Sequence, residues 1–271
     1  MRIVVVGPGR AGGAIALAAD AASHDVAAIV GRTTAAAAGL AERVGAEPLA
    51  VGTVLPPADL LIVAVRDDEL GGVAGQLVPA VGDIDNAVHV SGMKPVSVLV
   101  PLDHVGVRVG AFHPLQTLPD ADAGAKRLPG AWVALTASDL ELHALLVLLA
   151  GSLGMHAFDL ADEHRAVYHA AAAAAANFPV AALALAEDLF AAAGVPFAAA
   201  RPLSEAVISN VFDLGPRVAL TGPVARGDND TVHRQIEAVS ESAPEWRGAF
   251  LAFVRALARI SGRLHEYEDM L

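Results

Sequence analysis

The sequence of 271 residues contains no cysteine, and this absence removes several kinds of chemistry at once. Disulfide bonds, iron–sulfur clusters, thiolate zinc sites and cysteine nucleophiles all require the missing side chain. A reducing cytoplasm is the default location of such a chain, so we expect a cytoplasmic protein. Aromatic residues are also scarce, at 4%, and the hydrophobic share of 55% comes mainly from alanine, valine and leucine. This composition excludes disordered and collagen-like chains and predicts a folded globular protein.

Positive charge is scarce as well, because 18 lysines and arginines stand against 30 aspartates and glutamates, a net charge of −12. Nucleic-acid backbones and anionic lipid surfaces attract basic proteins, so we expect neither as a partner. A secretory signal is disfavoured because Gly7-Pro8-Gly9 interrupts the first apolar run. The stretch from Ala166 to Ala186 is long enough to span a bilayer, but it is alanine-rich and contains Asn177 and Pro179. We expect it to be a buried helix of a soluble protein, and no membrane partner.

Short apolar strands alternate with alanine-rich helical stretches in the first part of the chain, as in a parallel sheet covered on both faces. The expected strands span 3–6, 26–30, 60–65, 87–90, 107–112, 131–135 and 155–158, and the expected helices span 11–22, 34–44, 68–78 and 139–149. From residue 161 only helices are expected, broken at Pro179 and at later glycine and proline pairs. The predicted fold class is α/β, an N-terminal Rossmann doubly wound, mainly parallel sheet followed by an all-α C-terminal domain. We place the boundary between a nucleotide-binding domain of 1–158 and a substrate and dimerisation domain of 159–271.

A glycine-rich turn directly follows the first predicted strand and opens a helix, which is the context of a dinucleotide-binding loop. Its residues are Gly7, Pro8, Gly9, Arg10, Ala11 and Gly12. The glycines allow a tight turn, the approach of a pyrophosphate and close packing of helix on strand, while the helix N-terminus faces the phosphates. A glycine-rich turn without a ligand is the alternative interpretation.

The end of the second predicted strand indicates which dinucleotide binds. Where an NAD site places an acidic side chain on the ribose, this chain has Gly31, Arg32 and Thr33. A guanidinium and a hydroxyl suit the 2′-phosphate of NADP, so the sequence predicts NADP(H) as the cofactor. A solvated surface arginine is the alternative.

The strand expected at 60–65 ends beside the same crevice. We therefore expect Val65 and Arg66 to line the cofactor site. Asp67 follows them and is expected to cap the next helix rather than to bind ligand through its side chain.

Candidate catalytic residues occur in two places. Ser91 and His113 lie at the carboxyl ends of later strands, where an imidazole can exchange the proton that accompanies hydride transfer to a carbonyl. His169 and Asn177 lie eight positions apart on one predicted helix, which places them two turns apart and about 80° around its axis. A strand-end histidine bonded to backbone and a satisfied polar pair in a core are the alternatives.

A third cluster near residues 221–228 contains a hydroxyl, a guanidinium and a carboxylate. Thr221 and Arg226 are candidates to bind a substrate carboxylate, together with Asp228. The alternative is a loop in which Asp228 or Asp230 caps a helix from 231 to 240. We expect no metal site, because His164 and His169 have the wrong spacing for one helix face.

These motifs together resemble a bacterial family that joins an NADP-binding Rossmann-like domain to a helical domain of unknown function, DUF2520. The resemblance covers nearly the whole chain and is carried by Gly7 to Gly12, Gly31-Arg32-Thr33, Ser91-Gly92, Phe112 to Gln116, Tyr168 to Ala171 with Asn177, and Ala219 to Asp228. The family in turn resembles 6-phosphogluconate and 3-hydroxyisobutyrate dehydrogenases, ketopantoate reductase, pyrroline-5-carboxylate reductase and prephenate dehydrogenase. This implies an NADP-dependent oxidoreductase acting on a small keto or hydroxy acid, with ketopantoate as the first choice.

The resemblance also suggests residue roles. In ketopantoate reductase and the hydroxyacid dehydrogenases, a lysine on the first helix after the Rossmann domain is the general acid, with an asparagine one or two turns later. Here His169 occupies what resembles the lysine position and Asn177 the asparagine position. Prephenate dehydrogenase is similar in another way, through Ser91 and His113-Pro114. A prephenate-type dehydrogenase and a regulatory protein that binds NADP without turnover are therefore the alternatives.

The helical part is apolar on more than one side. The segments Ala181 to Ala186 and Phe250 to Ile260 offer broad apolar surface. Because relatives typically pair through this region, we expect a homodimer built mainly through the helical domain.

Overall fold

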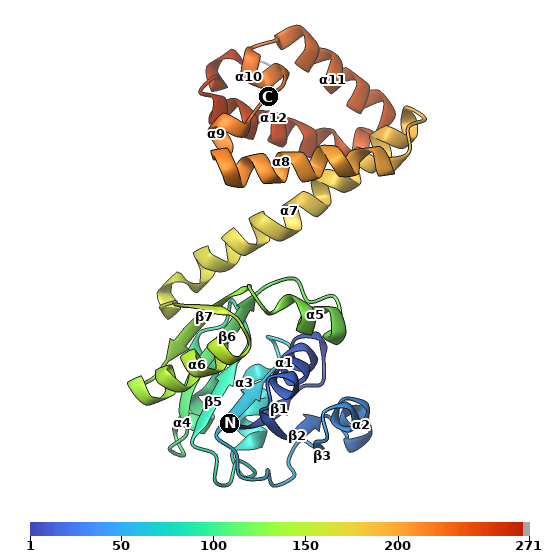
Figure 1. Cartoon of the computed structure of the whole chain (residues 1–271). Helices are drawn as coiled ribbons and strands as arrows, with labels where there is room; N and C mark the ends of the chain where they lie inside the picture. Colours follow the sequence, from blue (N-terminus) through green and yellow to red (C-terminus); the bar gives the residue numbers. More distant parts are fainter. Residues whose placement is uncertain (268–271) are drawn as a thin grey trace. The chain divides into compact units, whose positions relative to one another are not determined.

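Eight strands form one sheet in the order β3-β2-β1-β4-β5-β6-β7-β8 (Figure 1). The strands are β1 (Arg2–Val6), β2 (Asp25–Gly31), β3 (Glu47–Ala50), β4 (Leu60–Val63), β5 (Asn86–His89), β6 (Arg108–Leu115), β7 (Trp132–Ala137) and β8 (His156–Asp159). Only β6 and β7 pair antiparallel. The chain order reverses at β1, which has β2 on one side and β4 on the other. The carboxyl ends of β1 and β4 therefore meet where open α/β sheets bind ligands.

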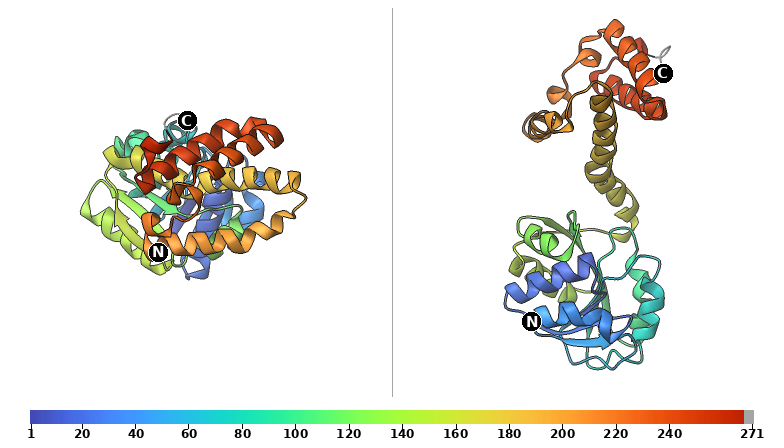
Figure 2. Two further views of the ribbon diagram at one scale, coloured as in Figure 1. Left: turned by 90° about the horizontal axis from the view of Figure 1, so that it is seen from above. Right: turned by 90° about the vertical axis from the view of Figure 1, so that its right-hand side faces the viewer.

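Alternation along β1 explains why helices cover both faces of the sheet. Ile3 and Val5 belong to one buried cluster, and Val4 and Val6 belong to the other. The first cluster includes residues of α1 (Arg10–Ala21), α2 (Thr34–Arg43) and α6 (Leu140–Ser152). The second includes residues of α3 (Leu70–Leu77) and α4 (Val100–Asp103), which follows the 3-10 turn Val96–Leu99. Two helical layers thus flank the sheet (Figure 2, right).

Helix α5 (Ala121–Arg127) packs on α1 with almost no side chain between the two backbones. A Cβ atom added to Gly13 would lie 2.7 Å from the Cβ of Ala121. A Cβ atom added to Gly124 would lie 2.7 Å from the Cβ of Ala14. The two glycines therefore set the distance between the helices.

The structure, a computed structural model, describes residues 1–267, which fall into two compact units, one of Met1–Ala174 and one that begins at Ala175. The division lies inside helix α7 (Arg165–Ala192), which is preceded by the 3-10 turn Asp162–His164. The last strand, β8, ends at Asp159. The domain boundary that we predict after residue 158 stays a prediction.

The second unit is helical throughout its described residues. After α7 come α8 (Ala200–Leu214), α9 (Pro216–Ala219), α10 (Pro223–Arg226), α11 (Asn229–Ser242) and α12 (Arg247–Ser261), with 3-10 turns at Phe197–Ala199, Pro244–Trp246 and Leu264–Glu266. Its buried core is small and consists of Val224, Val232, Ile236, Val254, Ala258 and Tyr267. The predicted α/β sheet followed by helices is confirmed.

Two expectations about α7 are wrong. Pro179 does not break the helix, which continues to Ala192. The proline removes one backbone donor, but the surrounding alanines favour the helix and this turn is exposed, so water can satisfy the freed carbonyl. The helix is also not buried: the segment Asp162–Ala192 is long and apolar enough to cross a membrane by length and composition, with a mean hydropathy of 1.5 over its most apolar window, and 6% of that window is buried.

Local details differ at shorter elements. Asp67 does not cap α3, because the helix begins at Leu70 after Glu69, which makes no side-chain cap. Arg66 instead binds the neighbouring Asp68, with Nε and Nη2 donating to its two carboxylate oxygens at 3.1 and 3.0 Å. The sequence analysis also missed the edge strand β3 and helix α5.

Candidate functional site

The glycine-rich turn has the geometry that its sequence predicts. Gly7 has a φ of +101°, and a Cβ atom there would lie 2.4 Å from the carbonyl oxygen of Ala64. A Cβ atom on Gly12 would lie 2.0 Å from the carbonyl oxygen of Gly7, so only glycine lets the helix start this close to the strand. By contrast, a Cβ atom on Gly9 meets nothing within 4 Å, so its backbone faces open space. Such a turn leaves backbone N–H groups free to face a phosphate.

A cavity of about 420 Å³ lies at the carboxyl edge of β1, β2 and β4. Among the residues that line it are Gly7, Pro8, Gly9, Gly31, Arg32 and Arg66. Val65 also lines it. The structure thus brings together seven of the predicted cofactor residues from three strand ends.

The remaining predicted cofactor residues have structural positions nearby. Arg10, Ala11 and Gly12 form the first turn of α1. Thr33 is the N-cap of α2, and its hydroxyl accepts a hydrogen bond from the backbone N–H of Ala36 at 3.2 Å. The hydroxyl oxygen of Thr33 therefore already has a partner within the helix, and Arg32 supplies the positive charge at this strand end.

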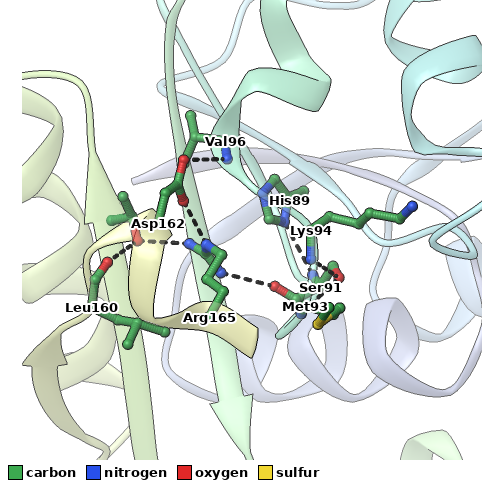
Figure 3. Close-up of polar contacts among 9 residues, drawn as sticks. His89, Ser91, Met93, Lys94, Val96, Leu160, Asp162 and Arg165 are labelled. Atoms are coloured by element: carbon green, nitrogen blue, oxygen red, sulfur yellow. Dashed lines mark hydrogen bonds and ion pairs between the residues drawn. The ribbon is translucent and has the colours of Figure 1, made fainter. Parts of the chain in front are cut away.

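Ser91 is buried and holds the loop that follows β5 (Figure 3). Its hydroxyl oxygen accepts hydrogen bonds from the N–H groups of Met93 and Lys94, at 3.2 and 3.0 Å. Its own N–H donates to Nδ1 of His89 at 3.2 Å. Among residues 1–267 no hydrogen bond joins Ser91 to His113, so Ser91 shapes the loop rather than orienting that imidazole.

Arg165, the first residue of α7, joins this loop to the start of the helix (Figure 3). Its side chain is 2% exposed, and Nε donates to Asp162 at 2.6 Å. Nη1 donates to the carbonyl oxygen of Ser91 at 3.2 Å, and Nη2 donates to the hydroxyl of Thr136 at 2.6 Å. The second oxygen of Asp162 accepts the N–H of Val96 at 2.9 Å. The buried guanidinium therefore has a partner on each of its nitrogens, as a buried charge requires.

His89 lies beside this cluster and is fully buried. Burial, reinforced by the positive charge of Arg165, lowers the pKa of His89 to about 4. Its Nε2 atom has no hydrogen-bond partner in the described part of the chain. His89 is therefore neutral at neutral pH and serves the loop as an acceptor.

His113 is held between the loop after β5 and helix α7. Its Nδ1 atom lies 2.6 Å from Oη of Tyr168, and the two rings pack edge to face with centroids 5.5 Å apart. On another side the ring lies against Gly92, where an added Cβ atom would be 2.7 Å from Cε1. Phe158 packs against the ring of Tyr168 with centroids 6.0 Å apart. The imidazole is thus held by contacts from two segments of the chain, and Phe158 supports the tyrosine that binds it.

Burial also sets the protonation of this pair. It lowers the pKa of His113 to about 4, with the positive charges of His169 and Arg165 acting in the same direction. Burial raises the pKa of the Tyr168 hydroxyl to about 12. At neutral pH the pair is therefore a neutral imidazole bonded to a neutral phenol.

The other two catalytic candidates, His169 and Asn177, lie eight positions apart on helix α7. His169 is exposed and makes no hydrogen bond within residues 1–267. Asn177 is also exposed and belongs to the second unit. The structure brings His113 close to Tyr168, a residue that the sequence analysis did not select as catalytic.

The residues near 221–228 form part of the second unit. Thr221 and Arg226 are exposed. Asp228 caps α11, because one carboxylate oxygen accepts the N–H of Thr231 at 3.2 Å and the other accepts its hydroxyl at 2.8 Å. These hydrogen bonds lower the pKa of Asp228. The capping interpretation of Asp228 is confirmed, and Thr221 and Arg226 remain candidates for a substrate carboxylate.

Sequence reasoning missed Tyr168, Arg165 and His89 as members of the site. Tyr168 had a usable signal, since it precedes His169 in a motif already singled out. Arg165 and His89 had none, because their partners lie far away in the sequence.

Comparisons with known proteins agree with this architecture. A Rossmann-like domain profile matches residues 1–114, and the profile of DUF2520, a domain of unknown function, matches residues 131–257. The fold and the glycine-rich cavity thus define a dinucleotide-binding α/β protein. More particularly, the chain belongs to the proteins that combine a Rossmann-like domain with a DUF2520 domain. No curated protein matches the sequence.

Solved structures match over nearly the full length. BF3122 from Bacteroides fragilis, provisionally assigned as an NADP oxidoreductase, is 25% identical, with a TM-score of 0.80 over 95% of this chain and 98% of that one. TM1727 from Thermotoga maritima is 22% identical, with a TM-score of 0.74 over 96% of this chain and 98% of that one. An imine reductase from Myxococcus stipitatus in complex with NADP⁺ is 13% identical, with a TM-score of 0.67 over 99% of this chain and 95% of that one. The last two show a shared fold.

Proposed function

We propose that this protein is an NADP-dependent oxidoreductase that transfers a hydride between the nicotinamide and a small keto or hydroxy acid. The observation that carries this proposal is the cavity at the carboxyl edge of the sheet, where the open backbone of Gly9 and the side chain of Arg32 face one space. Backbone N–H groups at a helix start suit a pyrophosphate, and a guanidinium suits a 2′-phosphate. Ketopantoate is the first substrate to test.

The named structural relatives support the same reaction class. The assignment of BF3122 names NADP oxidoreductase activity, and the imine reductase was solved with NADP⁺. A pyrroline-5-carboxylate reductase from Streptococcus pyogenes also shares the fold, at 17% identity. Because these proteins act on different acceptors, cyclic imines belong in the substrate panel beside keto acids.

The chain's own residues have separate tasks in this proposal. Bound NADPH supplies the hydride. Gly7 to Gly12 hold the pyrophosphate, Arg32 holds the 2′-phosphate, Arg66 lines the same cavity, and the Ser91 loop borders the nicotinamide. In the second unit, Asn177 is proposed to orient the reacting carbonyl, while Thr221 and Arg226 bind the carboxylate.

Two alternatives make different demands. A prephenate-type dehydrogenase would use His113 and would oxidise a large carboxylated ring, whereas a regulatory protein would bind NADP without turnover. Oxidation of NADPH measured against ketopantoate, other 2-keto acids and cyclic imines, with prephenate and NADP⁺ in the reverse direction, separates them. Tight NADPH binding with no turnover on any of these compounds would favour the regulator.

Arg32 provides the sharpest test of the cofactor. Arg32→Asp should weaken NADPH binding about 10-fold to more than 100-fold, because it removes a charged contact worth roughly 1.5 to 3 kcal/mol. NADH binding should change little. Fluorescence titration of both cofactors gives the two dissociation constants, and Arg234→Asp, an exposed charge reversal on α11, is the matched control. Equal affinity of the wild type for NADH and NADPH would reject NADP as the cofactor.

We also propose a homodimer, but through a different surface from that expected. The segment Phe250 to Ile260 supplies Val254 and Ala258 to the unit's own core. Eight exposed apolar side chains of the second unit are Phe178, Val180, Leu203, Val207, Ile208, Phe212, Leu214 and Val218. They lie on α7, α8 and α9, and so large an apolar surface is unusual for a monomer. Light scattering at micromolar concentration measures the mass directly.

A further inference from the structure

The hydrogen bond between Tyr168 and His113 links α7 directly to the imidazole near the end of β6. The two residues are 55 positions apart, yet Oη and Nδ1 lie 2.6 Å from each other. Both rings have fixed orientations, since Gly92 packs against one and Phe158 against the other. A contact this short between oriented groups suits proton transfer.

The pair also lies at the edge of the sheet that the cofactor is proposed to occupy. Strands β1, β4, β5 and β6 are successive neighbours. Gly7, Val65 and Ser91 follow the first three strands, and His113 lies near the carboxyl end of β6, two positions before the strand ends at Leu115. Adjacent strands are about 4.8 Å apart, so the ends of β1 and β6 are about 14 Å apart along this edge. A dinucleotide whose pyrophosphate rests on Gly7 extends its nicotinamide half towards β5 and β6.

The atoms of His113 have different surroundings. Nδ1 faces Tyr168, whereas Nε2 has no hydrogen-bond partner among residues 1–267 and is not one of the buried unpaired atoms there. Nε2 therefore retains some solvent-accessible surface. The charged and titratable groups that face this imidazole are His169 and Arg165 on α7 and Asp67 after β4.

We propose that Tyr168 is the catalytic proton donor of the reduction and that His113 replaces its proton. This inference rests on the proposed function. As the hydride of the reduced nicotinamide reaches the acceptor carbon, the proton of Tyr168 Oη passes to the acceptor oxygen or nitrogen. The hydrogen on Nδ1 of His113 passes to Oη, and Nε2 takes a proton from water. Tyr168 and His113 both end neutral, and one solvent proton is consumed for each hydride transferred.

This arrangement uses both groups in the protonation states that their surroundings favour. His113 stays neutral at every step, in keeping with a pKa of about 4. A tyrosinate is costly here, because burial raises the pKa of Tyr168 to about 12, and the Nδ1 hydrogen prevents it from accumulating. His169, by contrast, is exposed and has no hydrogen bond to residues 1–267 that would orient its ring.

The test compares Tyr168→Phe, His113→Gln and His169→Gln, with His164→Gln as the matched control on an exposed neighbouring histidine. Tyr168→Phe keeps the ring and its packing, and it should lower kcat for NADPH oxidation by about 10² to 10⁴-fold. His113→Gln should lower it as well, while NADPH dissociation constants stay within about twofold. The wild-type rate should be level between pH 5.5 and 8.5, roughly, because neither group titrates there. The rate in mixtures of H₂O and D₂O should follow a curve, since three protons move in one step.

A readout independent of turnover is the nitrogen NMR spectrum of the histidines. Tyr168→Phe should shift the Nδ1 signal of His113, whereas His164→Gln should leave it in place. Full activity of Tyr168→Phe, or a wild-type rate that falls above pH 6.5 and loses this fall in His169→Gln, would overturn the inference and leave the oxidoreductase intact. If the wild type oxidises NADPH with no keto acid, imine or other acceptor of the panel, the proposed function fails and the inference with it.

Discussion

The two units of this chain bury their apolar side chains to different degrees. The first unit places two extensive clusters on opposite faces of its sheet, and its strands β1 and β4 have buried residues on both faces. The second has a core of six buried residues and leaves most of α8 exposed, with Ala200 its only buried residue. Phe112 in the first unit is fully buried, whereas Phe212 in the second is 85% exposed. The comparison teaches that the Rossmann-like unit buries most of its large apolar side chains within itself, while the helical unit leaves many of its own exposed.

The two phenylalanines test this difference with one kind of substitution. Phe112→Ala should lower the free energy of unfolding by about 3 to 5 kcal/mol, because it opens a cavity in a packed core. Its effect should not depend on protein concentration. Phe212→Ala should leave the isolated chain nearly as stable but weaken self-association, so its effect should grow as the protein is diluted. Urea unfolding at several concentrations, with light scattering, measures both. A concentration-independent loss in Phe212→Ala would contradict a partner on α8.

Two arginines, one buried in the first unit and one exposed in the second, allow the same comparison for a charged side chain. Arg165→Lys should destabilise the first unit by about 3 kcal/mol, because an ammonium cannot reach Asp162, Thr136 and the Ser91 carbonyl together. Arg201→Lys on α8 is the matched control, since its side chain is 81% exposed and its ion pair with Glu205 is 3.8 Å long. That change should stay within about 0.5 kcal/mol. Equal unfolding energies for the two variants would show that the buried guanidinium does not hold the loop.

The smallest expected effect is a pH dependence that comes from His89. Burial lowers the pKa of His89 to about 4 in the folded chain. Between pH 6.5 and 4 the unfolded chain therefore binds a proton on this histidine, whereas the folded chain does not. The stabilisation is therefore complete above pH 6.5 and is lost as the pH falls, by about 2 kcal/mol between pH 7.5 and 5. His89→Asn, which keeps an acceptor for the Ser91 N–H, should flatten the curve by this amount. The free energy of unfolding measured at the two pH values decides the matter.

Much of the first unit follows from local sequence signals. The strand at 3–6, the glycine turn and Arg32 could be predicted because a strand, a tight turn and a helix start are adjacent in the chain. The Tyr168–His113 pair could not, because it depends on where α7 begins relative to β6. Arg165 fixes that start through partners that lie up to 74 positions away.

The burial of α7 was misjudged for a different reason. A run of alanines predicts a helix with little charge, but composition does not say whether the same chain or a second one covers it. For Asp228 the sequence allowed two roles, a ligand group beside Arg226 or a helix cap. The hydrogen bond from the N–H of Thr231 shows that it caps α11.

The close contact between α1 and α5 limits how the sequence of this protein can change during evolution or design. At Gly13 and Gly124 the two helices touch without intervening side chains, so no rotamer can absorb an added methyl group. Any larger residue at Gly124 would push the helix that opens with the pyrophosphate loop, although Gly124 lies more than a hundred positions away from that loop in sequence. Libraries that aim to switch cofactor preference should therefore vary Arg32 and Arg66 and leave both glycines unchanged.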